Sequence, residues 1–155
     1  MKEKNYLPTN NNVSQAFITD ICSIIDNGRR TAYESVGNIM IQTYWNVGKR
    51  IVEEEQKGNE RAEYGKRIIE QLSNELTHRY GKGFSKRYLA YFRKFYLTIS
   101  DMEILQTRLQ NLTWSHILTA LRADSETSIR WYLNMASQEM WNVRTLSRNI
   151  WSSTM

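Results

Sequence analysis

Residues Thr77 to Ser100 have the sequence THRYGKGFSKRYLAYFRKFYLTIS, the most informative stretch of this chain. Gly81 predicts the end of one helix and Gly83 a tight reversal, because glycine adopts left-handed backbone at no steric cost. Ser85 is a good N-cap, since its hydroxyl accepts a free backbone N–H of the first turn, and the helix after it is expected to reach about Ile99. The stretch therefore predicts two helices joined by a short turn, the arrangement of a helix-turn-helix.

The charged side chains of this stretch are all basic: it holds six Lys and Arg side chains and one His but no Asp or Glu. At about 100° per residue, the second helix divides into an apolar and a basic face. The apolar face holds Tyr88, Leu89, Phe92, Phe95, Tyr96 and Ile99, and the basic face holds Lys86, Arg87, Arg93 and Lys94. Tyr91 flanks the basic face, where it either contacts a ligand or forms the rim of the core. The face suits phosphate binding, but ordinary solvation of an exposed helix explains it equally well.

Apolar residues at three- and four-residue spacing predict further helices on both sides of the stretch. Gly28 is expected to close the first of them, and a capping box from Ser100 to Glu103 to begin another. The expected ranges are Ala16 to Gly28, Arg30 to Gln56, Tyr64 to Tyr80, Trp114 to Leu121, Glu126 to Met140, and Asn142 to Trp151. The helix over 30–56 is apolar around much of its girth, which predicts a central position with neighbours on two sides. No alternating run is long enough to predict a strand. The fold class is expected to be all-α: a compact multi-helix domain of about six to eight helices containing a helix-turn-helix-like unit.

A chain of 155 residues suits one domain around a single core. Residues 1–12 are polar and predict a disordered tail, which leaves 13–151 as the helical domain. Cys22 stands in an apolar run and is expected to be buried and free of any internal disulfide. The sequence has neither a leader nor a long apolar run, which favours a cytoplasmic protein without a membrane partner. The net charge of +5 and a pI of about 9.4 bias the protein toward polyanions.

The sequence predicts no catalytic centre, metal site or cofactor. Glu55-Gln56-Lys57 has the letters of a nuclease Glu-x-Lys motif, but it ends a helix with no strand pattern around it, so a solvated charge run is favoured. His78 and His116 are far apart and have no nearby Cys ligands, which argues against zinc. His116 is expected to hydrogen-bond locally in the first turn of its helix. No phosphate-binding Gly-rich loop occurs, so the chain is expected not to be an enzyme.

Six blocks of this sequence resemble those of the YhcG-like N-terminal domain family. They are YWNVGKRI (44–51), RAEYG (61–65), GFS (83–85), RKFY (93–96), LTWSH (112–116) and WNVRTL (141–146). The resemblance covers about Val13 to Trp151 and implies a helical, helix-turn-helix-like bacterial domain that normally precedes a PD-(D/E)XK nuclease domain. These 155 residues are expected to lack the nuclease part, so the resemblance carries over no catalytic residue.

The function predicted is a non-catalytic DNA-binding accessory domain of such a nuclease. The residues predicted to bind nucleic acid are Arg79, Lys82, Lys86, Arg87, Tyr91, Arg93 and Lys94, and the partners are DNA and a nuclease domain or subunit. A second basic pair, Arg144 and Arg148, is interpreted as an ordinary helix-end feature. The alternative function is protein–protein interaction or oligomerisation, suggested by five Trp, nine Tyr and four Phe, among them Trp131, Trp141 and Trp151. These tryptophans equally suit gaps between the C-terminal helices.

Overall fold

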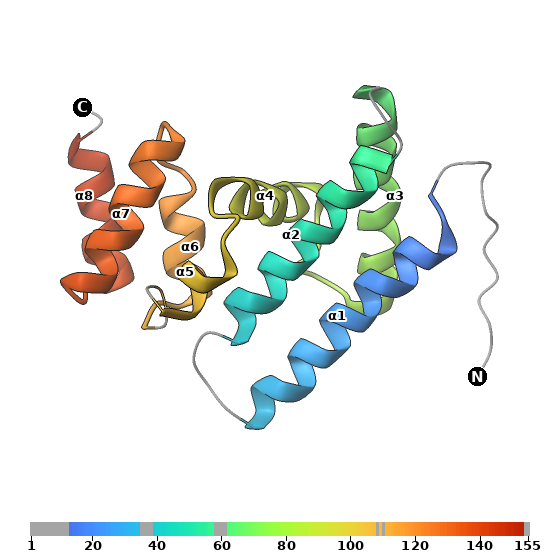
Figure 1. The fold of residues 1–155 in the computed structure, drawn as a ribbon, viewed down its shortest axis with the longest axis horizontal. Coiled ribbons are helices and arrows are strands. Elements are labelled where there is room, and N and C mark those ends of the chain that lie inside the picture. The colour runs from blue at the N-terminus through green and yellow to red at the C-terminus, as the bar shows by residue number, and fades with distance from the viewer. Residues whose placement is uncertain (1–12, 35–38, 58–61, 108, 110, 154–155) are drawn as a thin grey trace.

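The computed structural model describes residues 13–34, 39–57, 62–107, 109 and 111–153, and these contain eight helices and no strand (Figure 1). The helices are α1 (Gln15–Glu34), α2 (Ile39–Lys57), α3 (Ala62–Tyr80), α4 (Lys86–Thr98), α5 (Met102–Thr107), α6 (Trp114–Ala120), α7 (Glu126–Gln138) and α8 (Val143–Ser153). The all-α fold class predicted from the sequence is confirmed. No helix in the described ranges has both the length and the apolar character needed to cross a membrane.

Helix α2 occupies the centre of the N-terminal half, as its wide apolar face predicted. It packs against α1 on one side and α4 on another, while α6, α7 and α8 pack together at the far end of the molecule (Figure 1). Gly48 allows the close contact between α2 and α4, because a Cβ at this position would overlap the Phe92 carbonyl oxygen. The backbone of α4 is therefore seated directly on α2.

The buried side chains form two clusters where the sequence predicted a single core. One cluster joins α1, α2 and α3 to the first half of α4, and the other joins the start of α2 and the second half of α4 to α5–α8. Trp114 packs against both clusters, and the Trp45 indole donates a hydrogen bond to the Ile99 carbonyl. Two clusters form because α2 buries a different face in each, with Ile41 and Trp45 in one and Val47 and Ile51 in the other, while the apolar face of α4 runs from one cluster to the other along its length.

The predicted boundary between the first two helices is wrong. Gly28 does not close the first helix, which continues to Glu34, so residues 30–34 belong to α1 rather than to the second helix. Gly28 is buried against α2, where a Cβ would overlap the side chain of Thr43. This glycine therefore serves helix packing and not helix termination. Residues 35–38 of the predicted second helix lie outside the described residues, as does the tail over 1–12.

The predicted cap of the short helix α5 is also shifted by one residue. The carboxylate of Asp101 accepts the backbone N–H of Glu103 at 2.9 Å, which makes Asp101 the N-cap. An aspartate is as good an N-cap as a serine and adds a charge that favours the helix N-terminus. The helix itself begins at Met102, within the predicted box.

The turn between α3 and α4 is confirmed residue by residue. Gly81 and Gly83 have positive φ angles of 88° and 105°, which side chains other than glycine rarely adopt. The Ser85 hydroxyl accepts the backbone N–H of Tyr88 at 3.2 Å and begins α4. In Figure 1, α3 stands upright and α4 lies across it. A DNA-binding helix-turn-helix role for this pair stays a prediction.

Candidate nucleic-acid interface

The basic face predicted for α4 is divided into two stripes. Lys86 and Arg93 are seven residues apart and lie along one line of the helix, whereas Arg87 and Lys94 lie along another about 100° away. Tyr91 stands between Arg87 and Lys94 on the second line. The two stripes consequently face different neighbours.

Carboxylates partly neutralise the first stripe. The Arg93 Nε lies 2.9 Å from both carboxylate oxygens of Glu55, which projects from α2 and is 19% exposed. The Lys86 ammonium lies 3.7 Å from Glu70 of α3, and both of these side chains are largely exposed. Glu55, the residue that resembled a catalytic acid in sequence, thus serves as the partner of Arg93.

The second stripe has a different environment, because Arg122 reaches it from the segment after α6. Hydrogen bonding from Arg87 lowers the pKa of the Tyr91 phenol, burial opposes this effect, and Arg122 lowers the pKa further. The Arg87 guanidinium carbon lies 6.0 Å from the centre of the Tyr91 ring. Within the ranges that the structure describes, neither arginine forms an ion pair with a carboxylate. Two guanidinium groups therefore converge on one tyrosine.

Lys94 holds this arrangement in place. Its ammonium donates a hydrogen bond of 2.8 Å to the carbonyl of Leu121, which is the C-cap of α6. A cation is favourable there because the last carbonyls of a helix have no partner within it and carry its partial negative charge. Arg122 follows Leu121 directly, so this bond fixes the start of its segment against α4. We call Arg87, Tyr91, Lys94 and Arg122 the arginine–tyrosine patch.

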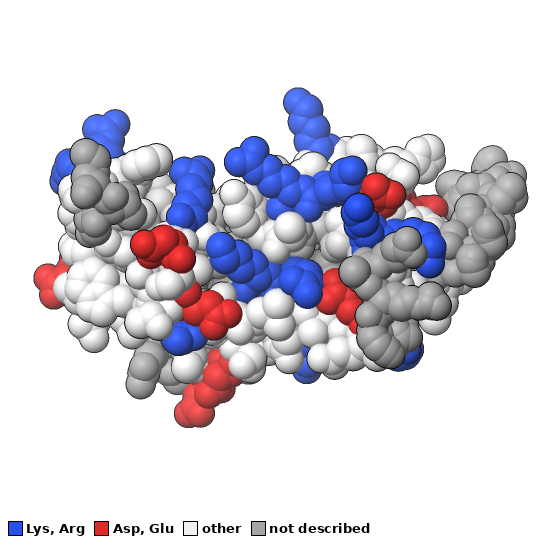
Figure 2. Space-filling model, turned by 90° about the horizontal axis from the view of Figure 1, so that it is seen from above, with Lys and Arg blue, Asp and Glu red and all other residues white. Residues whose placement is uncertain are grey.

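Figure 2 shows the surface charge on one face of the molecule. Lys and Arg side chains gather around the middle of the long axis, at the level where α4 lies in Figure 1, and Asp and Glu side chains lie at the flanks of that group. The grouping agrees with a basic centre flanked by mixed charge.

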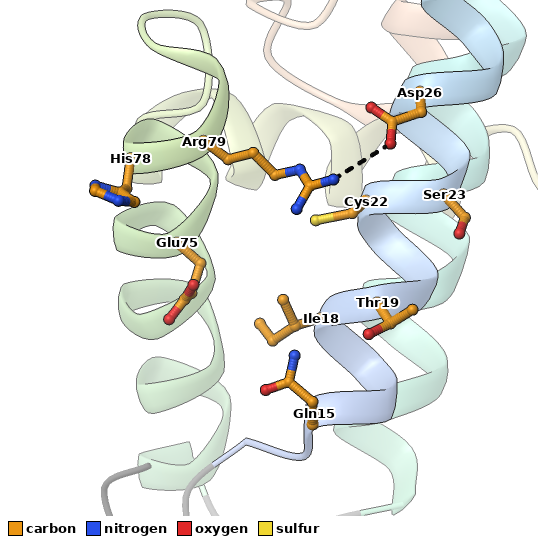
Figure 3. Close-up of a pocket in the computed structure, with 9 residues that line it drawn as sticks. All are labelled: Gln15, Ile18, Thr19, Cys22, Ser23, Asp26, Glu75, His78 and Arg79. Atoms are coloured by element: carbon orange, nitrogen blue, oxygen red, sulfur yellow. Dashed lines mark ion pairs between the residues drawn. The ribbon is translucent and has the colours of Figure 1, made fainter. Parts of the chain in front are cut away.

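Two further predicted residues lie outside α4. Arg79 faces α1, where its guanidinium is 3.6 Å from Asp26, and it lines a pocket of about 370 Å³ between α1 and α3 (Figure 3). Burial raises the pKa of the Cys22 thiol in the same pocket, which keeps the thiol protonated. Lys82 is exposed in the turn before α4, and no contact in the described part of the chain joins it to Arg87 or Arg122.

The two histidines offer no metal centre in the described residues, where no group of three or more His, Cys, Asp or Glu side chains is placed to hold an ion. His116 instead closes a capping box at the start of α6, which confirms the local role predicted for it. Its Nδ1 accepts the backbone N–H of Thr113 at 3.0 Å, so the proton lies on Nε2, which is 2.8 Å from the Trp141 carbonyl.

The candidate interface combines three residues predicted from the sequence with one that was missed. Arg87, Tyr91 and Lys94 share a stripe that the helical spacing contains, whereas Arg122 comes from a turn far along the chain. Its only local signal is its place just after a helix C-terminus. The helical wheel also gave no sign of the carboxylates that face Lys86 and Arg93.

Comparisons with known proteins agree with the resemblance in the sequence blocks. Residues 20–155 match the family described as DUF1016 N-terminal domain. The Escherichia coli (strain K12) protein described as "Putative nuclease YhcG" is 43% identical over 93 residues, which are 60% of this chain and 25% of that protein. The chain thus spans about a quarter of the length of this relative. No solved structure gives a significant match. With most of its length matched, the chain belongs to the DUF1016 N-terminal domain family.

Proposed function

We propose that this chain is a non-catalytic domain that binds nucleic acid through the arginine–tyrosine patch on behalf of a nuclease. The observation that carries the proposal is the meeting of Arg87 and Arg122 at Tyr91, with no carboxylate in ion-pair contact with either arginine among the described residues. Two like charges repel each other, so their convergence is favourable when an anion lies between them. Guanidinium groups match phosphate oxygens in geometry as well as in charge.

The position of the patch on α4 favours phosphate contact over the reading of bases. Leu89, Phe92 and Phe95 are buried, and α4 packs against α2, α3 and α7. A recognition helix that enters the major groove presents polar side chains to base edges. The exposed positions of α4 hold cations, Tyr88, Ala90 and Leu97, and the helix has no amide or carboxylate to pair with a base edge. We therefore propose that the α3–α4 pair holds Arg87 at the start of α4 against the sugar–phosphate backbone, without entering the groove.

The link to a nuclease is supported by the family and by the name of the relative, which describes that protein as a nuclease. We propose that the domain supplies affinity for the substrate, while a nuclease domain or subunit supplies the chemistry. Incubation of the purified chain with plasmid DNA and Mg²⁺ tests the division of roles. Metal-dependent cleavage that co-purifies with the folded chain would contradict a purely binding role.

Fluorescence anisotropy with a labelled duplex, recorded at several salt concentrations, tests the binding proposal. Arg87→Glu and Arg122→Glu are each expected to lower the affinity by about tenfold or more and to reduce the salt slope by roughly one for each phosphate that is no longer neutralised. Lys66→Glu is the matched control, because it makes the same charge change at an exposed site on α3. Equal decreases in affinity in all three variants, or no decrease in the two arginine variants, would overturn the proposal.

Self-association is a second candidate function, supported by two large apolar side chains on the surface. Trp131 is 53% exposed on α7 and Met140 is 76% exposed just after it. Aromatic residues and methionine are enriched at protein interfaces. Light scattering over a range of concentrations measures the oligomeric state, and Trp131→Ala is expected to weaken any dimer. A chain that stays monomeric at high concentration would exclude this function.

A further inference from the structure

A small pocket adjoins the arginine–tyrosine patch between α6 and α8. It has a volume of about 110 Å³ and is lined by Thr119, Arg122, Ser147, Ile150 and Trp151. Ile150 and the Trp151 indole supply apolar wall, and Arg122 belongs to both the pocket and the patch. A ligand can therefore contact the arginine and the indole at the same time.

Helix α8 extends the basic surface beyond this pocket. Arg144, Arg148 and Trp151 follow each other at four- and three-residue spacing, which places them on one side of the helix. The two arginines are exposed, Trp151 is 63% exposed, and α8 contains no Asp or Glu. In the described part of the chain, neither arginine is ion-paired. The pair interpreted as a helix-end feature thus belongs to a surface that also offers an aromatic ring.

We infer that the pocket beside Trp151 receives one unpaired nucleic-acid base, so that the domain binds single strands in preference to duplexes. This inference rests on the proposed function and names its ligand more narrowly. The phosphates of the strand lie against Arg87 and Arg122, and the base after them stacks on the Trp151 indole. The cations and the ring lie in this order along the surface from α4 to α8.

The chemistry of a stacked duplex explains the preference. Paired bases keep their flat faces against neighbouring bases, so an indole beside a phosphate-binding arginine finds no exposed base face on a duplex. A single strand exposes base faces, and alternating contacts of phosphate with arginine and of base with aromatic ring are typical of proteins that bind single strands. Such stacking tolerates any base, because every base has a flat face.

The test compares a labelled single-stranded oligothymidylate with a duplex of the same length. Trp151→Ala is expected to lower the single-strand affinity by about tenfold and to leave the duplex affinity unchanged. Trp151→Phe keeps a ring and should retain most of the affinity. Trp131→Ala is the control, because it removes another exposed indole that lies outside the pocket.

The outcomes separate this inference from the proposed function. Loss of binding in Arg87→Glu together with unchanged single-strand binding in Trp151→Ala would refute the base pocket and leave the phosphate patch standing. Equal loss of both probes in Trp151→Ala would also refute it, because the ring would then act without selecting single strands. Displacement of the single strand by polyglutamate at equal charge concentration would show general polyanion binding and overturn the base pocket. Failure of the wild-type chain to bind either probe would overturn both proposals.

Discussion

The contact of α2 with α4 at Gly48 gives the sharpest test of the fold. In Gly48→Ala, the added methyl group overlaps the Phe92 carbonyl oxygen and lies 3.3 Å from the Arg93 backbone nitrogen. The obstacle is backbone, which cannot rotate away as a side chain can. The helices must therefore separate, and overpacking of this kind typically costs about 1–3 kcal/mol. We take a value of about 3 kcal/mol, at the upper end, because two packed helices must move apart.

Alanine also favours the helix over glycine by about 1 kcal/mol, so the expected net loss is about 2 kcal/mol. For a chain of this size, such a loss lowers the melting temperature by about 4–8 °C. Urea unfolding followed by circular dichroism measures the free energy directly. Gly65→Ala is the matched control: it lies within α3, and the nearest atom to its Cβ is a Glu55 carboxylate oxygen at 3.9 Å. This control should gain up to about 1 kcal/mol. Equal gains in both variants would refute the close α2–α4 contact.

Three further predictions concern single side chains. His116→Ala should lower the free energy of unfolding by about 2 kcal/mol, since it leaves the Thr113 N–H and the Trp141 carbonyl without their partner. Thermal melting measures this loss, and an unchanged melting temperature would contradict the capping role. Burial and a hydrogen bond to Asp26 raise the pKa of Tyr80, so its contribution to stability is complete below the ordinary tyrosine pKa of about 10 and is lost as pH rises above it. Urea unfolding should show that the free energy of unfolding falls less between about pH 9 and 11 in Tyr80→Phe than in the wild type. An equal fall would contradict the pKa shift. Glu55→Gln removes the charge that neutralises Arg93 and should raise the affinity for DNA by about two- to fivefold at low salt, which anisotropy measures. An unchanged affinity would place Arg93 outside the interface.

Helix ends that depend on local chemistry were predictable from the sequence. The positive φ angle of Gly81 and the hydroxyl cap of Ser85 each involve atoms within a few residues, so the turn between α3 and α4 followed from its composition. Gly28 looks the same in sequence but has a different role, because the side chain of Thr43 in α2 leaves no room for a Cβ at this position. A glycine that serves packing cannot be told from one that ends a helix until the neighbouring helix is known.

In the candidate interface, too, the local features were predictable and the contacts between helices were not. Helical spacing places Arg87, Tyr91 and Lys94 together because it depends on one helix alone. The partners that decide which cations remain available come from elsewhere: Glu55 projects from α2, and Arg122 follows α6. Charge pairing between helices is a tertiary property, so a run of basic residues overstates the positive surface that the folded chain presents.

Helix α4 passes from one buried cluster to the other between Phe92 and Phe95, next to Lys94, whose bond to the Leu121 carbonyl lies on the side of the second cluster. A bound strand that touches Arg87 and Arg122 would span the same junction from outside and act as a second tie across it. Because a ligand stabilises only the state that binds it, such a strand would favour unfolding of both halves in one step. The cooperativity of unfolding would therefore differ between the free domain and the domain bound to a strand.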